Sequence, residues 1–432
     1  METISAPVDA FLTRHGMDPA RSDPAESTPR FLEEMERGLA GASSSVLMLP
    51  TYLTGEGVVP QEEPVIVLDV GGTNFRVALV TITRGEPCIE NLRVFPMPGS
   101  QASVTWDQFI DTVADSVLPL TGRSRRVGLC FSYTTEILPN RDGRVLSLSK
   151  QVRIVGAEGK LLGCALTDAL ADRGVFGVRV TVLNDGAAAL LGGMAEQSGE
   201  RFDGRFSLIY GTGVNTCCSV PASRISRLAV PWRGDMLVNP ESGGFNRVEQ
   251  GEYDRALDAA STDPGKALYE KMVSGRYEGE VILRTLRGAA AEGLLSGQLS
   301  RRLAALDQLT LAQVSAYADR PYGGGVLAAA CATEEDRETV YTVIDRSVQR
   351  CANLVCANLA ALLELTDTGR SLHRPACVVA EGSTFDKSHL FRSKLEHVCT
   401  TYVTDMLGRR LVFRQVNHVN LVGTAAAVLM NT

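Results

Sequence analysis

Two short glycine turns lie between β-like segments, and each has the composition of a phosphate-binding turn. The first, Gly-Gly-Thr at 71–73, follows the apolar run 65–70, and the second, Gly-Thr-Gly at 211–213, follows the run 206–210. Backbone N–H groups can converge on a polyphosphate only where a turn admits positive φ and carries no bulky side chain, which favours glycine. Each turn taken alone also fits an ordinary hairpin. Two of them, each with a threonine hydroxyl, favour a nucleotide site.

Charged residues flank the first turn. Asp69 stands just before it and has the hard oxygen ligand that a hydrated Mg²⁺ prefers. Arg76 follows the turn and could neutralise phosphate charge, although a structural ion pair is the alternative. The sequence therefore predicts a bound Mg-nucleotide beside this turn.

The order of the segments indicates an α/β protein. After the first glycine turn the chain continues as a second strand instead of entering a helix, which distinguishes it from a dinucleotide-binding or P-loop unit. The strand–turn–strand unit recurs at 206–220, so we expect a duplicated fold with a cleft between its halves. A long helix is expected at 334–365, whereas the segment 299–325 has no clear pattern. Further β-rich runs and helical patterns alternate between the two turns: 75–83, 104–120, 127–133, 161–172 and 178–183.

Composition excludes several classes of protein. The chain has 432 residues, 44% of them hydrophobic, which is typical of a globular protein of two or three domains. A net charge of -7 argues against nucleic acid as a partner. The cysteines and histidines have no zinc-binding spacing. No run approaches the ~18 apolar residues of a membrane span and no signal-peptide pattern is present, so we expect a cytoplasmic protein without a membrane partner.

Several segments, in the same order along the chain, resemble the eukaryote-type hexokinase family. The segment 68–76 (Leu-Asp-Val-Gly-Gly-Thr-Asn-Phe-Arg) is similar to that family's first phosphate motif nearly residue for residue. The resemblance covers most of the chain, fades between about 299 and 333, and is taken here to indicate a bacterial member. The other matching segments are 34–39, 48–52, 211–215, 239–245 and 263–275.

The resemblance implies a two-lobed α/β fold of the actin-like ATPase (ribonuclease H-like) type, with a deep cleft between a small and a large domain. The small domain is expected to comprise residues 61–186 and 417–432. The large domain is expected to comprise residues 1–60 and 187–416. We expect the two lobes to close on the substrate. We expect the protein to be a monomer or a homodimer.

The implied activity is ATP-dependent phosphorylation of the 6-hydroxyl of glucose, with mannose or fructose as further candidate substrates and Mg²⁺ with ATP as cofactors. Asp185 would be the base that accepts the hydroxyl proton, and Lys150 would contact the sugar and stabilise the transferred phosphoryl group. Asp185 follows the strand 178–183, at the edge where α/β sheets bind ligands. An Asn-Asp pair after a strand is, however, also a common helix cap.

The resemblance also implies the remaining site residues. The sugar would be bound by Ser132, Ser149, Lys150, Asn184, Asp185, Asn215, Glu241 and Glu270. The nucleotide would be bound by Asp69, Gly71, Gly72, Thr73, Asn74, Arg76, Gly211, Thr212, Gly213, Gly382 and Ser383, with Asp69 holding Mg²⁺ through water.

The sequence departs from the family's pattern in the sugar loop and at the adenosine side. Phe-Ser-Tyr-Thr at 131–134 replaces the family's Phe-Ser-Phe-Pro, and Leu-Ser-Lys-Gln-Val stands at 148–152. We expect these changes to leave the hydrogen-bonding groups in place and to alter the packing behind them. At 381–387 the chain also differs from the usual adenosine motif.

Two other functions fit the same fold. A catalytically weak sensor would bind hexose for regulation without turnover, and an actin-like or heat-shock-type ATPase would hydrolyse ATP without a sugar. Glucose-dependent release of ADP distinguishes the kinase from both.

Overall fold

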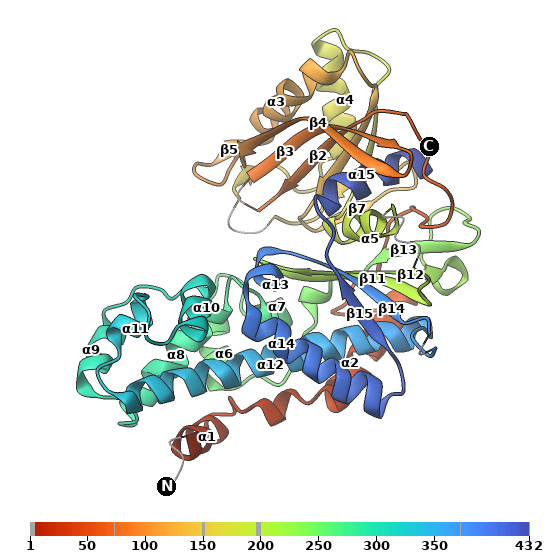
Figure 1. The fold of residues 1–432 in the computed structure, drawn as a ribbon. Helices are drawn as coiled ribbons and strands as arrows, with labels where there is room; N and C mark the ends of the chain where they lie inside the picture. Colours follow the sequence, from red (N-terminus) through yellow and green to blue (C-terminus); the bar gives the residue numbers. More distant parts are fainter. Residues whose placement is uncertain (1–4, 73, 149–151, 196–199, 372, 432) are drawn as a thin grey trace.

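Two lobes, each built on one mixed sheet, make up the protein (Figure 1). The structure is a computed structural model that describes residues 5–72, 74–148, 152–195, 200–371 and 373–431. Thr73, Ser149 and Lys150, three of the predicted site residues, lie outside these ranges.

The upper lobe in Figure 1 contains a five-stranded sheet of order β10-β6-β2-β3-β4. Strand β2 pairs antiparallel with β3 and parallel with β6. It is a central strand of the sheet and is buried along almost its whole length, as its unbroken apolar run indicates. The strands are β2 (Val65–Gly71), β3 (Asn74–Thr83), β4 (Glu86–Pro96), β6 (Arg126–Phe131) and β10 (Arg179–Leu183).

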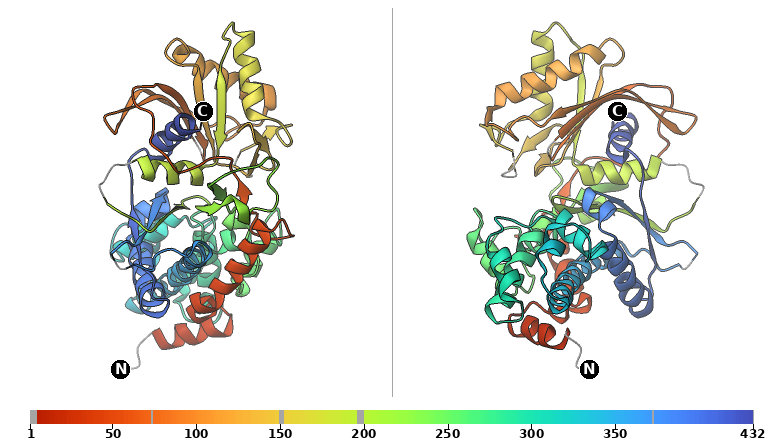
Figure 2. Two further views of the ribbon diagram at one scale, coloured as in Figure 1. Left: turned by 90° about the vertical axis from the view of Figure 1, so that its right-hand side faces the viewer. Right: turned by 60° about the vertical axis from the view of Figure 1, so that its left-hand side comes forward.

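Different helices cover the two faces of this sheet. Helices α3 (Trp106–Val117) and α4 (Leu162–Asp172) pack on one face, and α15 (Val419–Met430) packs on the other (Figures 1 and 2). Val65 and Val67 of β2 contact the α15 side. Side chains alternate along a strand, so Asp69, the one carboxylate of β2, lies on the same face as Val65 and Val67, near the end of the strand.

The lower lobe contains a six-stranded sheet of order β1-β13-β12-β11-β14-β15. The second glycine turn joins β11 to β12, as the first joins β2 to β3, which confirms the expected recurrence of the strand–turn–strand unit. Its strands are β1 (Leu49–Pro50), β11 (Gly204–Tyr210), β12 (Val214–Pro221), β13 (Asp235–Asn239), β14 (Ala376–Glu381) and β15 (Leu411–Arg414).

The long helix expected at 334–365 is present as α12 (Glu334–Thr366) and runs through the core of the lower lobe (Figure 1). Thr333 and Asp336 form a capping box at its start, and Asp367 in the left-handed conformation ends it. The unpatterned segment 299–325 contributes short helices beside α12. The other helices and short strands are α1 (Ser5–Arg14), α2 (Pro24–Leu39), α6 (Glu252–Ala260), α7 (Leu268–Val273), α8 (Glu278–Ala291), α9 (Gly297–Ala304), α10 (Leu311–Asp319), α11 (Val326–Ala330), α13 (Ser383–Lys387), α14 (His389–Val398), β5 (Val104–Thr105), β7 (Thr135–Ile137), β8 (Gly143–Val145) and β9 (Ile154–Val155).

Helix α5 (Asp185–Ala195) lies between the two sheets. One of its core clusters includes Cys130 of β6 in the upper sheet and Cys217 of β12 in the lower sheet. Helix α15 packs against α5, and Gly423 permits the contact because a Cβ atom there would overlap the carbonyl oxygen of Ala188. The predicted domain boundaries stay a proposal. The packing of the C-terminal helix α15 on the upper sheet supports the part that assigns residues 417–432 to the small domain.

None of the helices in the described ranges is both long and apolar enough to cross a membrane.

We expect Gly423→Ala to lower the free energy of unfolding by about 1–3 kcal/mol, because the added methyl group forces α15 away from α5. Gly122→Ala is the matched control, since a Cβ at Gly122 would meet no atom within 4 Å. Chemical denaturation of both variants measures the effect. Equal stability of Gly423→Ala and the wild type would show that the two helices do not pack this closely.

Candidate active site

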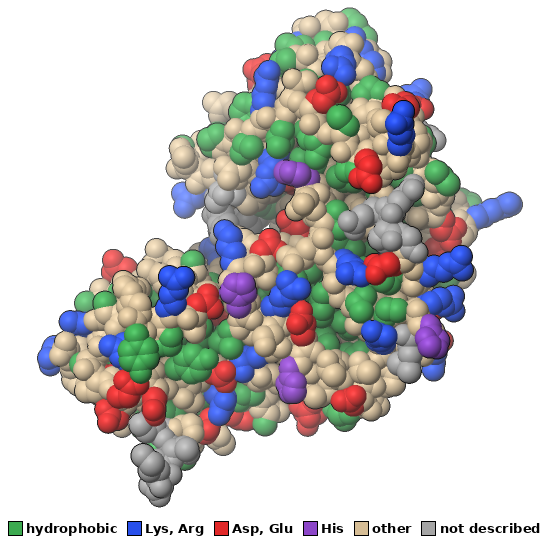
Figure 3. Space-filling view, in the orientation of Figure 1, with side chains coloured by type: hydrophobic (Ala, Val, Ile, Leu, Met, Phe, Trp, Pro, Cys, Tyr) green, Lys and Arg blue, Asp and Glu red, His purple; other side chains and the backbone are tan. Residues whose placement is uncertain are grey.

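One cavity of about 750 Å³ opens between the two lobes. It is bounded above by the β2–β3 turn and the ends of β6 and β10, and below by the β11–β12 turn, β13, α7 and β14. The space-filling view shows the molecular outline hollowed between the lobes (Figure 3). On the face shown, positive and negative side chains are interspersed.

The first glycine turn presents an ion pair to this cavity. The β2–β3 register places Asp69 opposite Arg76, and Arg76 Nη1 donates to Asp69 Oδ2 at 2.8 Å. Arg76 therefore does form an ion pair within the protein, which was the alternative to a phosphate contact. Both residues also line the cavity. Burial raises the pKa of Asp69, and the charge of Arg76 opposes that rise.

The second glycine turn is fixed by other segments of the lower lobe. The N–H of Gly275 donates to the carbonyl of Gly211 at 2.9 Å, and the N–H of Arg276 donates to that of Thr212 at 3.3 Å. Thr384 Oγ1 donates to the same Gly211 carbonyl at 3.1 Å. Because these bonds use the carbonyl groups of the turn, its shape is set before any ligand binds.

Gly382 brings the start of α13 against this turn. Its φ of 124° lies in the region that favours glycine, and a Cβ there would lie 2.5 Å from the Tyr210 carbonyl oxygen. Ser383 follows and is exposed at the cavity. The two predicted adenosine residues thus lie next to the second turn.

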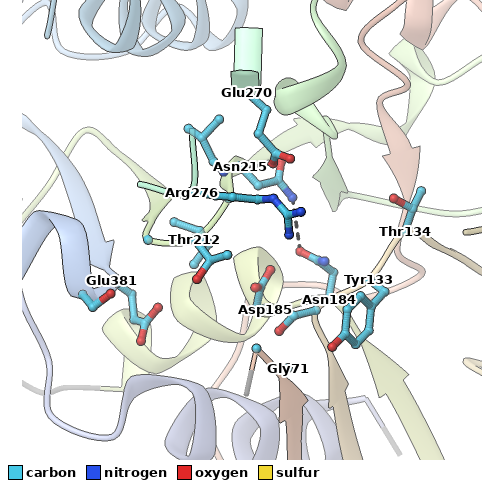
Figure 4. A pocket seen from close by; sticks show the side chains of 18 of the residues that line it. Gly71, Tyr133, Thr134, Asn184, Asp185, Thr212, Asn215, Glu270, Arg276 and Glu381 are labelled. Atoms are coloured by element: carbon cyan, nitrogen blue, oxygen red, sulfur yellow. Dashed lines mark hydrogen bonds between the residues drawn. The ribbon is translucent and has the colours of Figure 1, made fainter. Parts of the chain in front are cut away.

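Three asparagines and a glutamate form a connected network at the cavity; Asn184, Asn215 and Glu241 line it, and Figure 4 shows the contact between Asn184 and Asn215. Asn215 Nδ2 donates to Asn239 Oδ1 at 2.7 Å and lies 3.4 Å from Asn184 Oδ1. Asn239 Nδ2 in turn donates to Glu241 Oε1 at 2.9 Å. The φ of 54° at Glu241 places it in the left-handed region, which is strained for a residue other than glycine. The network fixes this carboxylate in place.

Glu270 lies on the same side of the cavity as this network. It is at the start of α7, and its Oε2 accepts from the N–H of Val214 at 3.3 Å. The adjacent Lys271 is buried and binds Asp258 at 2.6 Å, which anchors α7 from behind. Figure 4 shows Glu270 and Asn215 pointing into the cavity on one side and Asp185 and Asn184 on the other.

Asp185 begins α5 and faces the cavity. Burial raises the pKa of its carboxyl to about 7, and a hydrogen bond with Ser132 opposes the rise. The charges of Glu241 and Asp69 add to it. Its Oδ1 accepts from the N–H of Gly186 at 2.8 Å.

Two further carboxyl groups in the cavity are shifted in the same direction. Burial raises the pKa of Glu241 to about 7, against the effect of the Asn239 amide. Burial likewise raises the pKa of Glu381 to about 7, and the charge of Asp185 adds to it. A general base works best with a pKa near the operating pH, and this is the range of these groups.

The structure brings together every predicted site residue that it describes. The cavity is lined by Asp69, Gly71, Gly72, Asn74, Arg76, Ser132, Asn184, Asp185, Gly211, Thr212, Gly213, Asn215, Glu241, Glu270, Gly382 and Ser383.

The cavity also contains residues that the sequence analysis did not assign to the site: Tyr133, Thr134, Ser147, Leu148, Asp263, Arg276, Tyr277, Glu381 and Lys387. Thr134 Oγ1 lies 3.4 Å from Glu241 Oε2 and donates to it. The departure at 131–134 thus adds a hydrogen-bonding group beside a predicted site residue, in addition to the expected change in packing. The sequence did offer a signal for Thr134, because it departs from the family pattern two residues after the predicted site residue Ser132.

The architecture is the two-lobed α/β actin-like ATPase fold, with a polar cavity between two glycine turns. The chain belongs to the hexokinase family: two family models described as "Hexokinase" match residues 14–195 and 205–430.

Among its relatives are Hexokinase-3 of Mus musculus, 30% identical over 84% of this chain and 41% of that protein, and Hexokinase-1 of Oryza sativa subsp. japonica, 28% identical over 93% and 86%. The chain thus spans about two-fifths of the length of the mammalian relatives. The expectation of a bacterial member is not borne out by these matches.

The fold is similar to that of solved kinases. A hexokinase from Schistosoma mansoni complexed with glucose has a TM-score of 0.84 and 23% identity over 99% of this chain and 98% of that chain. A ROK family glucokinase from Streptomyces griseus in complex with glucose and AMPPNP has a TM-score of 0.53 and 20% identity over 84% and 98%.

The raised pKa of Asp185 predicts a pH-dependent cost of folding. The unfolded carboxyl titrates near its ordinary value, so between about pH 4 and pH 7 the folded state binds more protons and stability falls as the pH rises. We expect Asp185→Asn to be more stable than the wild type at pH 8, by about 1–3 kcal/mol, and the difference to shrink towards pH 5.

Asp307→Asn is the matched control, because Asp307 is exposed in the loop between α9 and α10. Urea denaturation at both pH values measures the difference. A stability gain for Asp185→Asn that is no larger at pH 8 than at pH 5 would contradict a buried charge at this position.

Proposed function

We propose that the chain is an ATP-dependent hexokinase that transfers the γ-phosphate of Mg-ATP to the 6-hydroxyl of glucose. The observation that carries this proposal is the single cavity in which Asp185, Asn215, Glu241 and Glu270 lie beside both glycine turns. Phosphoryl transfer requires positioning, charge neutralisation and a base for the attacking hydroxyl, and the cavity holds residues for each.

The polar half of the cavity suits a hexose. Each sugar hydroxyl both donates and accepts, so carboxylates serve as acceptors and asparagine amides as two-way partners. Asn184, Asn215 and Glu241 supply both kinds of group in one network connected through Asn239, and Glu270 adds a further carboxylate to the cavity. A site of this kind disfavours a sugar that lacks one hydroxyl, because a polar side chain would then lose its partner. Mannose and fructose are further candidates on the same grounds.

Asp185 is the proposed base. It is the carboxylate at the junction of the two halves, on the α5 N-terminus and next to Ser132. A raised pKa increases its ability to accept the proton of the attacking 6-hydroxyl near neutral pH. Lys150 is proposed to contact the sugar and the transferred phosphoryl group, and Ser149 the sugar.

The two glycine turns are proposed to hold the phosphates, with hydroxyl contacts from Thr73 and Thr212 and charge from Arg76. In the described part of the chain no three His, Cys, Asp or Glu residues group as metal ligands. Asp69 nevertheless fits a Mg²⁺ ion, because such ions are commonly held by one or two carboxylates, waters and the substrate's phosphates. When bound, Mg²⁺ neutralises charge on the phosphates. Asp69 would hold it through water, and Gly382 and Ser383 would contact the adenosine.

A kinase for a sugar hydroxyl must also exclude water, which would otherwise attack ATP. The upper wall carries Asp185 and the lower wall carries Glu241 and Glu270, so rotation of the lobes towards each other would enclose the sugar. Thr134 and Glu241 already lie 3.4 Å apart across the two walls. A cytoplasmic location and a monomeric or homodimeric state complete the proposal.

We expect Asp185→Ala to lower kcat for glucose phosphorylation at least about a hundredfold, because the substitution removes the proposed base for the 6-hydroxyl proton. Glucose binding should persist, since the network around Glu241 and Glu270 is untouched. A coupled ADP-release assay and calorimetry measure the two quantities, with Asp307→Ala as the surface control. Near-normal kcat in Asp185→Ala would exclude Asp185 as the base. Glucose binding without turnover by the wild type would instead favour the sensor.

The pH profile supplies a separate test. Protonation removes the base, so kcat/KM for glucose should fall as the pH drops below about 7, the value to which burial raises the pKa of Asp185. Steady-state rates from pH 5 to pH 9 measure this limb. A profile that stays flat down to pH 5 would contradict the assignment.

A further inference from the structure

Arg276 lines the cavity between the second glycine turn and Glu270. Arg276 follows α7 in the chain and is exposed to solvent. Its side chain points into the cavity (Figure 4). No motif and no resemblance assigned it to the site. Its position between the proposed sugar and phosphate subsites raises the question of what the guanidinium binds.

The main chain of Arg276 is attached to the phosphate turn itself. Its N–H donates to the Thr212 carbonyl at 3.3 Å, and the preceding Gly275 N–H donates to the Gly211 carbonyl at 2.9 Å. A Cβ at Gly275 would lie 2.7 Å from the Gly211 carbonyl oxygen, so glycine is what permits this approach. The starting point of the Arg276 side chain is therefore fixed relative to the turn.

The guanidinium makes no ion pair with any residue in the described ranges. Its Cζ lies 5.2 Å from the centre of the Tyr277 ring, a cation–π contact that orients it without neutralising it. Its charge acts at longer range on Glu270, where it opposes the rise in pKa that burial causes. A guanidinium has only donors and is always charged, so an anion is its best missing partner.

The charge balance of the cavity leaves few other cations for this task. The carboxylates that line it are Asp69, Asp185, Glu241, Asp263, Glu270 and Glu381. Of the other cations that line it in the described ranges, Arg76 is engaged by Asp69, and Lys387 lies at the end of α13. A polyphosphate that enters among so many carboxylates is repelled unless a positive group faces it.

We propose that Arg276 is a substrate-binding residue that contacts the terminal phosphate of the nucleotide from the lower wall of the cavity. The proposal rests on the proposed function, because it takes the second glycine turn as a phosphate subsite. Arginine suits this role, since its planar fork matches two phosphate oxygens at once. The contact would also draw the terminal phosphate towards the side of the cavity where Glu270 holds the sugar.

Arg276→Gln tests the contact, with Arg276→Lys as the conservative variant and Arg301→Gln as the control. Arg301 is exposed on α9, outside the cavity. Calorimetry with Mg-AMPPNP, Mg-ADP and glucose gives each dissociation constant separately. We expect Arg276→Gln to weaken Mg-AMPPNP roughly tenfold to a hundredfold and Mg-ADP less, while glucose affinity changes less than about twofold. Arg276→Lys should recover part of the loss, and Arg301→Gln should match the wild type.

The outcomes separate this proposal from the kinase assignment. Weaker glucose binding with unchanged Mg-AMPPNP binding in Arg276→Gln would overturn it in favour of a sugar contact. Unchanged binding of all three ligands would also overturn it, as would a wild type that binds no Mg-nucleotide. A wild type that binds glucose and Mg-AMPPNP without turning over would refute the kinase assignment alone, and the binding comparison would still decide the role of Arg276.

Discussion

Several carboxyl groups share one cavity, and the cations among the described lining residues are fewer, so this crowding governs the chemistry of the site. Asp185, Glu241 and Glu381 each have a pKa raised by burial, and the negative charge of a neighbour adds to each shift. Such a cavity is costly to the folded protein on its own. It is suited to a hexose, which donates many hydrogen bonds, whereas the phosphates of a nucleotide need positive charge beside them.

The rest of the fold serves to hold these groups at fixed positions. Helix α5 lies between the two sheets, so its first residue, Asp185, stands where the walls of the cavity meet. The left-handed backbone at Glu241 and the buried Lys271 behind Glu270 fix the opposite wall. Each wall is thus held by contacts within its own lobe, as the proposed closure of the lobes on a substrate requires.

The parts of the site predictable from sequence were those encoded locally. The glycine turns and Asp69 follow from short-range rules, because strand, turn and carboxylate are contiguous. Glu270 carries no such signal, since it looks like an ordinary residue of a short helix and only the family resemblance indicated it. Arg276 and Thr134 escaped prediction because their roles depend on long-range contacts, with the Thr212 carbonyl and with Glu241 respectively. The segment 299–325 showed no clear pattern for a related reason: its helices are short, and each is placed by packing against neighbouring helices, α9 on α8 and α10 partly on α12.

The central claim is that one cavity binds a hexose and a nucleotide side by side, and a crystal structure with glucose and Mg-AMPPNP tests it most directly. The account predicts the sugar O6 within hydrogen-bonding distance of the Asp185 carboxylate, ring hydroxyls on Glu241 and Glu270, and phosphates against both glycine turns. Glucose bound elsewhere, or bound here with O6 directed away from Asp185 and from the terminal phosphate, would contradict it.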